Sequence, residues 1–394
     1  MKEGWEYKKL IDVCDFQGGS QPPKSEWIKH DSPGYIRMLQ IRDFTQSRKV
    51  SPEYVKLTNR TKCCFSDDIL IGRYGASLGI ILTGIAGAYN VAIMRTIPNE
   101  TLLSKGYLKY YLMSSIFQSF LLNIGGRAAQ AGFNKEDLKC LNIPITTLDE
   151  QRRIVSYLDS SFKSIDEIKD KALKSLTEAK ALFQSALAEA MEPKEGWEEK
   201  TLGEICTIVG RIGFRGYTRK DIVSDKKDGA ITLSPSNIVD GKMSYLNCTY
   251  ISWYKYEESP EIKIYEGDIL MVKTGSSYGK TAYVDYLPHK ATINPQFVVL
   301  KDVKINKKYL SYQLKTKNTF DYIKSIVSGS AIPTFSQANL AKMELTVPPL
   351  SSQEQIVTHL DTLSSTIRKL EENYRKTLAE CDALKQAVLR EVFE

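Results

Sequence analysis

Histidine and cysteine are scarce in this chain, and their scarcity excludes several kinds of chemistry. The 394 residues include 3 histidines and 7 cysteines, and no two cysteines have the C-x-x-C spacing of a zinc or redox site. His30, His289 and His359 are far apart in the sequence, so the pattern predicts neither a metal site nor a Ser-His-acid triad. Because the cysteine number is odd and the spacing irregular, we expect reduced thiols, as in a cytoplasmic protein.

Long apolar runs are also missing. No segment approaches the roughly 20 apolar residues that span a bilayer, and the beginning of the sequence lacks the apolar stretch of a signal peptide. Hydrophobic residues make up 42% of the chain and charged residues 26%, as in ordinary globular proteins. We therefore expect a soluble, cytoplasmic protein of two to three domains.

Glycine and proline are absent from residues 148–190 and from residues 350–392. In the second segment, apolar residues recur at alternating steps of four and three, which is the heptad pattern of a coiled coil. The first segment is looser, because Ser161 and Ser175 fall at heptad positions. We predict one long helix in each segment. The residues expected to pair them are Ile154, Leu158, Ile165, Ile168, Leu182, Ile356, Leu360, Leu363, Ile367, Leu370, Leu384 and Val388.

Most of the sequence occurs twice. Residues 2–6 (KEGWE) return as residues 194–198, and the segment around Gln151 and Asp159 returns around Gln353 and Asp361. A period near two hundred residues is far longer than any solenoid repeat, so it indicates a duplicated domain. Within each copy, short β-branched runs alternate with glycine- and proline-containing loops, which is typical of strands.

These patterns predict an α+β fold with a pseudo-twofold internal repeat. Two similar, mostly-β domains are separated by two long helices, and the expected boundaries are 1–147, 148–192, 193–349 and 350–394. Twofold symmetry would make the two helices antiparallel, so we expect them to pair within the chain as a coiled coil. Homodimerisation through the same residues, or docking of another protein, is the alternative.

Charge is unevenly distributed. The net charge is +7, and the excess of lysine and arginine lies in residues 1–147 and 193–349, whereas both helical segments are slightly acidic. Two basic domains favour a polyanionic partner that is held at two places. The alternative is a mildly basic protein with no such partner.

Two short motifs resemble cofactor sites without matching them. The segment 275–281 (GSSYGKT) is one residue short of a P-loop, and its counterpart 75–81 keeps only the glycines, so a turn with two flexible residues is the better interpretation. Residues 294–297 (NPQF) resemble the motif of amino-methyltransferases but lack its second proline. We interpret Asn294 and its counterpart Asn90 as structural. Neither half has a recognisable active site, so the chain is not expected to be an enzyme.

The loops carry residues suited to nucleic acid. Arginine pairs with guanine, glutamine and asparagine pair with adenine, and lysine neutralises phosphates; solvated surface loops are the alternative. The loops differ between the copies whereas the helices agree, which predicts two different half-sites. The candidates in the first domain are Gln21, Lys24, Arg37, Gln40, Arg42, Arg73, Tyr74, Arg127 and Gln130. Those in the second domain are Arg211, Arg215, Tyr217, Arg219, Lys220, Asn237, Lys273, Tyr278 and Lys280.

The order of these features resembles that of the specificity (S) subunit of type I restriction–modification systems. The resemblance covers the whole chain and depends on the Gly-Trp pairs at residues 4–5 and 196–197, the domain ends at 142–159 and 346–357, and the turns 74–79 and 274–279. It implies a non-catalytic subunit that reads a bipartite, asymmetric site in double-stranded DNA. Two methylation (M) subunits and the restriction/motor (R) subunits would be its partners. S-adenosylmethionine, ATP and Mg would be bound by those partners and not by this chain.

Two other functions remain open at this stage. The chain is alternatively a coiled-coil adaptor with two protein-binding domains, or a DNA methyltransferase that uses residues 294–297. A steep loss of DNA binding with salt would separate DNA reading from the adaptor function, and binding of S-adenosylmethionine by the chain alone would favour the methyltransferase.

Overall fold

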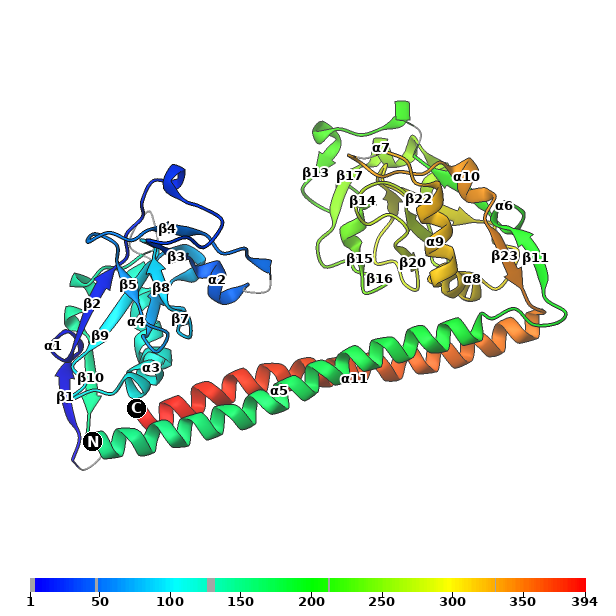
Figure 1. The fold of residues 1–394 in the computed structure, drawn as a ribbon. Coiled ribbons are helices and arrows are strands. Elements are labelled where there is room, and N and C mark those ends of the chain that lie inside the picture. The colour runs from blue at the N-terminus through cyan, green and yellow to red at the C-terminus, as the bar shows by residue number, and fades with distance from the viewer. Residues whose placement is uncertain (1–3, 47–48, 126–131, 212, 330) are drawn as a thin grey trace. The chain divides into compact units, whose positions relative to one another are not determined.

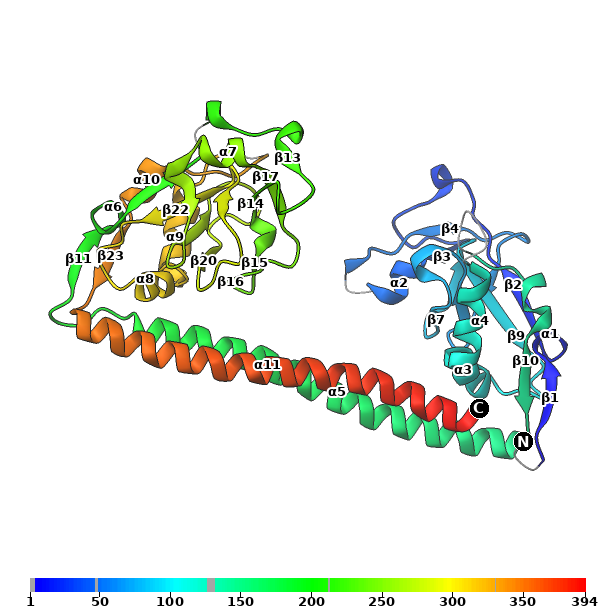
Figure 2. The same cartoon turned by 180° about the vertical axis from the view of Figure 1, so that it is seen from behind.

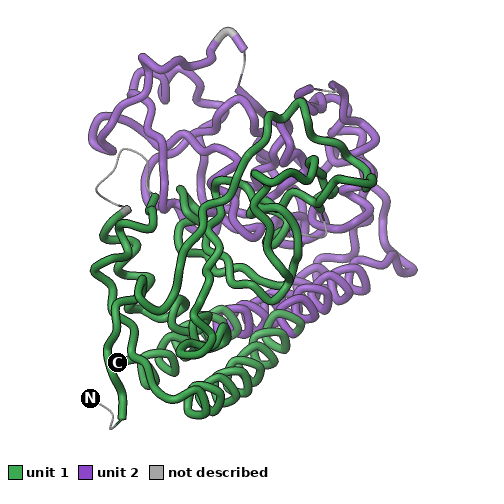
Figure 3. Tube along the Cα trace, turned by 60° about the vertical axis from the view of Figure 1, so that its left-hand side comes forward, with its two compact units in different colours: residues 1–174, 374–394 green, residues 175–373 purple. Residues whose placement is uncertain are grey.

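The computed structural model describes residues 4–46, 49–125, 132–211, 213–329 and 331–394. The chain forms two compact units, one of residues 1–174 and 374–394 and the other of residues 175–373 (Figure 3). Each unit therefore contains one β-rich domain and a part of each long helix. We describe the units separately.

In the described residues of the first unit, the β-rich part is built from two four-stranded sheets and one two-stranded sheet. The first sheet has the antiparallel order β2-β9-β6-β7, and the second has the order β4-β3-β8-β5, in which β3 and β8 are parallel. The two-stranded sheet joins β1 to β10. The strands are β1 (Glu6–Lys9), β2 (Cys14–Gly18), β3 (Tyr35–Leu39), β4 (Tyr54–Lys56), β5 (Cys63–Cys64), β6 (Leu70–Gly72), β7 (Ile81–Leu82), β8 (Gly87–Tyr89), β9 (Ile93–Pro98) and β10 (Asn142–Ile145).

The short helices of the first unit close one side of its core. Ser104 caps the first of the pair α3–α4 by accepting a hydrogen bond from the Tyr107 amide. Tyr107, Tyr111 and Phe117 from these helices are completely buried in the main core of the unit. The helices are α1 (Leu10–Val13), α2 (Ile41–Thr45), α3 (Lys105–Met113) and α4 (Ser115–Gly125).

The second unit repeats this plan with larger sheets. Its sheets have the orders β12-β22-β19-β20-β16-β15 and β13-β17-β14-β21-β18, and β11 pairs with β23. The strands are β11 (Glu198–Thr201), β12 (Thr207–Gly210), β13 (Ile222–Val223), β14 (Gly229–Leu233), β15 (Ile238–Val239), β16 (Lys242–Met243), β17 (Thr249–Ser252), β18 (Lys263–Ile264), β19 (Ile269–Val272), β20 (Thr281–Tyr283), β21 (Ala291–Ile293), β22 (Phe297–Lys301) and β23 (Glu344–Val347). The helices are α6 (Leu202–Ile205), α7 (Trp253–Glu257), α8 (Lys307–Gln313), α9 (Lys317–Ile326) and α10 (Gln337–Ala341).

The two long helices are α5 (Leu148–Ala190) and α11 (Leu350–Phe393). In the first unit Asp166 and Lys169 of α5 pair with Lys385 and Asp382 of α11. In the second unit Lys180 of α5 lies 3.9 Å from Glu371 of α11. Rising numbers on one helix meet falling numbers on the other, so the pairing is antiparallel, as predicted, and the helices lie side by side in each unit (Figure 1).

The buried positions of the helix pair differ in part from the predicted heptad set. Ile154, Leu158, Ile165, Leu360 and Ile367 are buried, whereas Ile356, Leu363 and Val388 are only partly buried. The small side chains Ala172, Ala179 and Cys381, which the heptad pattern also includes, are buried as well. Four predicted positions are wrong for the buried seam, because their exposed fractions lie between 39% and 58%; they are Ile168, Leu182, Leu370 and Leu384.

The same joint connects each domain to its long helix. The Gln151 side chain accepts a hydrogen bond from the Ser104 amide at 2.9 Å and donates to two carbonyls, and Gln353 accepts from the Asn306 amide at 2.8 Å and donates to one. Asp159 accepts from the Tyr110 hydroxyl in the first unit, as Asp361 accepts from Tyr312 in the second. The side chains that the two copies share are therefore those that fix a helix to its domain. Figure 2 shows β10 leading into α5 and β23 leading into α11.

No helix in the described parts of the chain is long and apolar enough to cross a membrane.

Candidate nucleic-acid interface

The glycine turns near residues 75 and 275 have the backbone conformation that the sequence predicted. Gly75 and Gly79 have φ of 57° and 79°, and Gly275 and Gly279 have φ of 105° and 80°. Side chains with a Cβ avoid this left-handed region, so both turns require glycine. In each copy the turn is closed by an amide of the second glycine, which donates to a strand carbonyl at 2.9 Å or 2.8 Å. The motif is thus a structural turn in both domains.

Three predicted side chains of the first domain meet at one carboxylate. Lys24 and Arg42 each lie 2.7 Å from Glu53, and the Gln40 amide donates to the same group at 3.2 Å. We call these four residues the Glu53 cluster. The hydrogen bond from Lys24, the charge of Arg42 and the Gln40 bond together hold the pKa of Glu53 below its usual value, although burial opposes them. The cluster is a preformed polar surface with Lys24 and Arg42 exposed to solvent.

The other predicted residues of the first domain lie apart from this cluster or are committed to the framework. Arg37 pairs with the buried Asp43 at 2.8 Å. Arg73 donates to the Phe133 and Val91 carbonyls at 3.3 Å, and its guanidinium lies 4.9 Å from the ring centre of Tyr74, which is exposed. Gln21 is exposed. The last two, Arg127 and Gln130, lie outside the described residues.

In the second domain the structure gives Arg211 a different role from the predicted one. Its side chain is 5% exposed and donates to the Ile293 carbonyl at 3.0 Å, to Thr292 at 3.2 Å and to the Arg215 carbonyl at 3.3 Å. Burial lowers its pKa. The guanidinium ties Arg215 to the strand β21, and it lies 5.3 Å from the ring centre of Tyr217. We therefore remove Arg211 from the candidate DNA contacts.

Asn237 is likewise used by the fold. It is 3% exposed, its oxygen accepts from the Ser234 amide at 2.9 Å, and its NH2 donates to the Ser244 and Asn247 carbonyls at 3.0 Å and 3.3 Å. The whole amide is satisfied by the chain, so it has no capacity left for adenine. The sequence could not separate this buried asparagine from an exposed one.

The remaining predicted residues of the second domain differ in exposure. Arg219 and Lys220 are exposed on a short 3-10 helix that Thr218 caps. Arg215 lies 3.6 Å from Glu261, Lys273 is partly buried, which lowers its pKa, and Tyr278 stacks on Phe320 at 6.1 Å. Lys280 is exposed at the end of the glycine turn.

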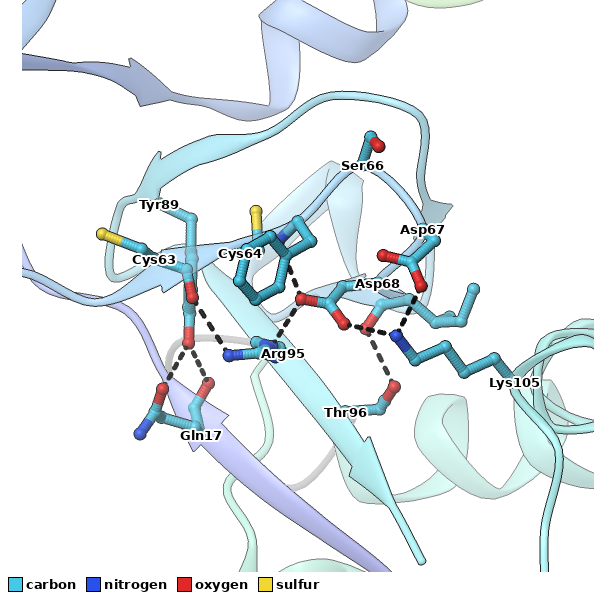
Figure 4. Close-up of polar contacts among 12 residues, drawn as sticks. Gln17, Cys63, Cys64, Ser66, Asp67, Asp68, Tyr89, Arg95, Thr96 and Lys105 are labelled. Carbon is cyan, nitrogen blue, oxygen red and sulfur yellow. Dashed lines mark hydrogen bonds and ion pairs between the residues drawn. The ribbon is translucent and has the colours of Figure 1, made fainter. Parts of the chain in front are cut away.

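The sequence reasoning missed a buried ion network in the first domain. The Asp68 carboxylate pairs with Arg95 at 2.8 Å and with Lys105 at 3.0 Å, and Lys105 also contacts Asp67 (Figure 4). The second domain has a simpler version, in which Asp268 pairs with Lys301 at 2.6 Å. The repeated Asp-Ile-Leu at residues 68–70 and 268–270 was the available signal. The network ties strands to the helix α3; Asp68 is buried within it, whereas Asp67 is largely exposed.

The polar side chains of the remaining motifs stabilise the local fold. The Asn90 oxygen accepts from the Ala92 amide, and the Asn294 oxygen accepts from the Gln296 amide, as expected of structural asparagines. All seven cysteines are free, and burial raises the pKa of Cys14 and Cys206 to about 12. Among the described residues no group of histidine, cysteine and carboxylate side chains has the arrangement of a metal site.

Comparison with known proteins identifies a family that has this duplicated architecture. A family model described as the type I restriction modification DNA specificity domain matches residues 2–178 and again residues 194–379. The chain belongs to this family. Specificity subunits of type I systems are non-catalytic, so the chain is not an enzyme by itself.

Relatives of this specificity subunit occur in archaea and bacteria. The MjaVIII specificity subunit of Methanocaldococcus jannaschii is 22% identical over 95% of this chain and 90% of its own length. The StySPI specificity subunit of Salmonella potsdam is 20% identical over 100% and 89%. The chain thus covers nearly the full length of both.

Solved structures share its fold. A chain from a type I R-M system, solved in work on its complex assembly and conformational transition, has a TM-score of 0.78 at 19% identity, covering 100% of this specificity subunit and 98% of that chain. The HsdS subunit from Thermoanaerobacter tengcongensis has a TM-score of 0.53 at 19% identity, with coverage of 100% and 97%.

Proposed function

We propose that this specificity subunit reads a bipartite, asymmetric site in double-stranded DNA, with one half-site for each domain. The proposal is supported by the observation that the two domains share one framework but carry different sets of loops. The glycine turns and the joint at Gln151 and Gln353 are alike in both units. The Glu53 cluster has no equivalent in the second domain among the described ion pairs, where Arg219 and Lys220 extend from a separate loop instead.

The exposed cations of these loops suit a first contact with phosphates. Lys24 and Arg42 are held by Glu53, so their side chains lose little freedom when a phosphate arrives. Arg219 and Lys220 are exposed and follow a cap at Thr218 that fixes their backbone. Phosphate contacts position a protein on DNA, whereas base edges provide the sequence information. Gln21, Gln40 and Tyr74 are the candidates for base contacts in the first half-site.

We propose that the outer face of the helix pair receives the partner subunits. In the first unit Ile168 and Leu384 are both exposed, and in the second unit Leu182 and Leu370 are exposed. The copies match at an offset of 202 residues, so Ile168 corresponds to Leu370 and Leu182 to Leu384. Two equivalent apolar pairs suit two copies of one partner, the methylation subunit. Restriction/motor subunits would join this complex, and S-adenosylmethionine, ATP and Mg would be bound by the partners.

Methylation mapping tests the proposal. This chain would be co-expressed with the adenine methylation subunit from its own operon, and the modified bases of the host DNA would be sequenced. We expect methyladenine in a split, asymmetric motif that is absent when this chain is omitted. Methylation that does not depend on this chain would contradict the proposal.

Variants of Arg219 and Lys220 test the proposed phosphate contacts of the second domain. Arg219→Ala with Lys220→Ala should weaken DNA binding by the complex and reduce the salt dependence of binding, because each lost phosphate contact lowers the slope by about one. Lys317→Ala is the control, because Lys317 is also exposed but lies on α9 and pairs with Asp321. An equal loss in both variants would argue against a specific contact at residues 219–220.

A further inference from the structure

The second unit contains a cavity, and among the residues that line it only Lys280 is a candidate DNA contact. Its volume is about 670 Å³, within the range of small-molecule sites. Its walls come from the β15–β16 turn, β20, α8 and both long helices. All lining residues belong to residues 175–373, so the cavity lies within one compact unit.

Cations dominate this cavity. Lys242, Lys280, Lys315 and Arg368 line it, and no described carboxylate forms an ion pair with any of them. A fifth cation, Lys308, is neutralised by Asp361 at 2.9 Å. Asp240 and Asp285 are exposed carboxylates that also line the cavity, and the charge of Asp285 acts on Lys315.

Lys315 is the most enclosed of these cations. Its ammonium donates one hydrogen bond, to the Gly241 carbonyl at 3.1 Å, which leaves two N–H groups for a ligand. Burial lowers the pKa of Lys315 to about 8, so its charge is poorly solvated in the cavity wall. An anion placed beside it would stabilise the charged form.

The first unit shows what a filled version of this place looks like. At the offset of 202 residues Ser364 corresponds to Phe162, and Lys315 corresponds to Met113. Phe162 is 8% exposed and packs edge-on against Tyr110, with 5.2 Å between the ring centres. The second copy therefore replaces two large apolar side chains by a hydroxyl and a cation. These exchanges open the space and give it positive charge.

We propose that this cavity binds a phosphate-bearing small molecule of nucleotide size. Lys315, with Lys280 and Lys242, provides the cations for the phosphates. The hydroxyls of Ser364, Ser365 and Thr316 line the same space as hydrogen-bond partners. Phe183 and Tyr312, whose ring centres lie 6.3 Å apart, form an aromatic wall for the remainder of the ligand. The volume exceeds what phosphate alone would fill.

Calorimetric titration of the full chain tests this site, with ADP and inorganic pyrophosphate as probes and no divalent metal added. We expect one ADP per chain and weaker binding of pyrophosphate, which lacks the part that contacts the aromatic wall. Lys315→Met, which installs the residue of the first copy, should weaken ADP binding by about tenfold. Ser364→Phe should abolish it by filling the cavity.

Lys317→Met is the matched control, because Lys317 lies two residues from Lys315 but is exposed and is not part of the cavity wall. It should bind ADP as the wild type does. If Ser364→Phe does not fold, as judged by its thermal melting, the comparison of Lys315→Met with Lys317→Met decides. Absence of ADP binding at about 1 mM, or equal binding by both lysine variants, would overturn the proposal. Pyrophosphate that binds as tightly as ADP would overturn the nucleotide-sized assignment.

Discussion

At the scale of single residues, Asp68 accepts hydrogen bonds from the Phe65 amide at 2.8 Å and from Lys105 at 3.0 Å, and it pairs with Arg95. Burial alone would raise its pKa, but these three partners outweigh burial and lower it. A carboxyl group with a lowered pKa stabilises the fold above its unfolded pKa of about 3.9. This contribution is lost as the pH falls through the folded value.

Asp68→Asn should therefore destabilise the first unit by about 2 kcal/mol at pH 7, because bonds to a charged acceptor are lost. The difference from the wild type should shrink as the pH falls below about 4. Urea unfolding at pH 7 and at pH 3 measures both. Asp67→Asn is the control, since that carboxylate is largely exposed. A difference that is the same at both pH values would contradict the assignment.

Gln353 and Gln355 form a second matched pair. Gln353 is buried and joins the Asn306 amide to the Pro348 carbonyl, whereas Gln355 is exposed on the same helix. Gln353→Ala should lower the free energy of unfolding of the second unit by about 2 kcal/mol, because two buried groups lose their partners. Gln355→Ala should change it by less than about 0.5 kcal/mol. Thermal and urea unfolding of both variants measures these changes. Equal effects of the two substitutions would contradict the role of Gln353 in fixing α11 to its domain.

The residue type alone could not separate side chains that are available to contact DNA from side chains that stabilise the fold. Lys24 and Arg42 lie at the surface as predicted, but Arg211 and Asn237, of types equally suited to DNA, are buried with their polar groups satisfied. For Arg211 the difference is set by the strand β21, 82 residues away. For Asn237 the partners Ser234, Ser244 and Asn247 are close in the sequence, but the residue type alone does not show that they satisfy it.

At the scale of elements, the exposed apolar pair Leu182 and Leu370 is the feature to test. Leu182→Ser with Leu370→Ser should leave the chain folded, because neither side chain is buried, and should reduce co-purification of the methylation subunit by about tenfold. Leu350→Ser, at a leucine that is exposed outside these pairs, is the control. Unchanged co-purification of the double variant would remove this face as the docking surface.

The long helices allow a test of spacing. Inserting one heptad into both α5 and α11 preserves the repeat of the seam and adds about 10 Å of helix. If the helices set the distance between half-sites, the methylated motif should gain roughly three base pairs in its gap, at ~3.4 Å each. Methylation mapping of the variant measures this. A motif with its original gap would refute the spacer role.

The two long helices, which have a clear sequence periodicity, could be predicted from the sequence, whereas the shortest strands could not. The glycine- and proline-free segments end where α5 and α11 end, within two residues. The faces of these helices were predicted in part, because the heptad pattern includes the small residues Ala172, Ala179 and Cys381, which are buried, but also Leu182 and Leu370, which are exposed. Strands of two or three residues, such as β5 and β7, depend on partners elsewhere in the chain and leave no period of their own.

At the scale of the whole molecule, the duplication predicts independent reading by the two domains. Exchanging residues 1–147 for the first domain of another specificity subunit should change one half of the methylated motif and leave the other half intact. Gln151 and Asp159 lie outside the exchanged segment, so the new domain needs to bring the tyrosine that meets Asp159 and the aromatic residues that pack against Phe393. Changes in both halves of the motif would contradict modular reading.

The repeat was visible in the sequence, but the division of the chain was not. Sequence patterns separate domains from helices, whereas the compact units cut across both helices near residues 174 and 374. The reason is that the start of α5 packs with the end of α11, so each compact unit joins helix segments about 200 residues apart in the sequence. The cavity beside Lys315 was also not predicted from the sequence, since it arises where the small side chain of Ser364 replaces the larger Phe162 of the first copy.

The discontinuous first unit has a consequence for the order of synthesis. Leu389 and Phe393 of α11 belong to its core, and Phe393 packs against Tyr107 and Tyr111. The ribosome makes these residues about 200 residues after Lys174, a delay of ~10–40 s at usual translation rates. During that time the nascent first domain exposes the apolar surface that Phe393 will cover, while the uninterrupted second unit is completed. The domain made first is thus the one whose core closes last, and it is the one that needs protection from aggregation in the growing chain.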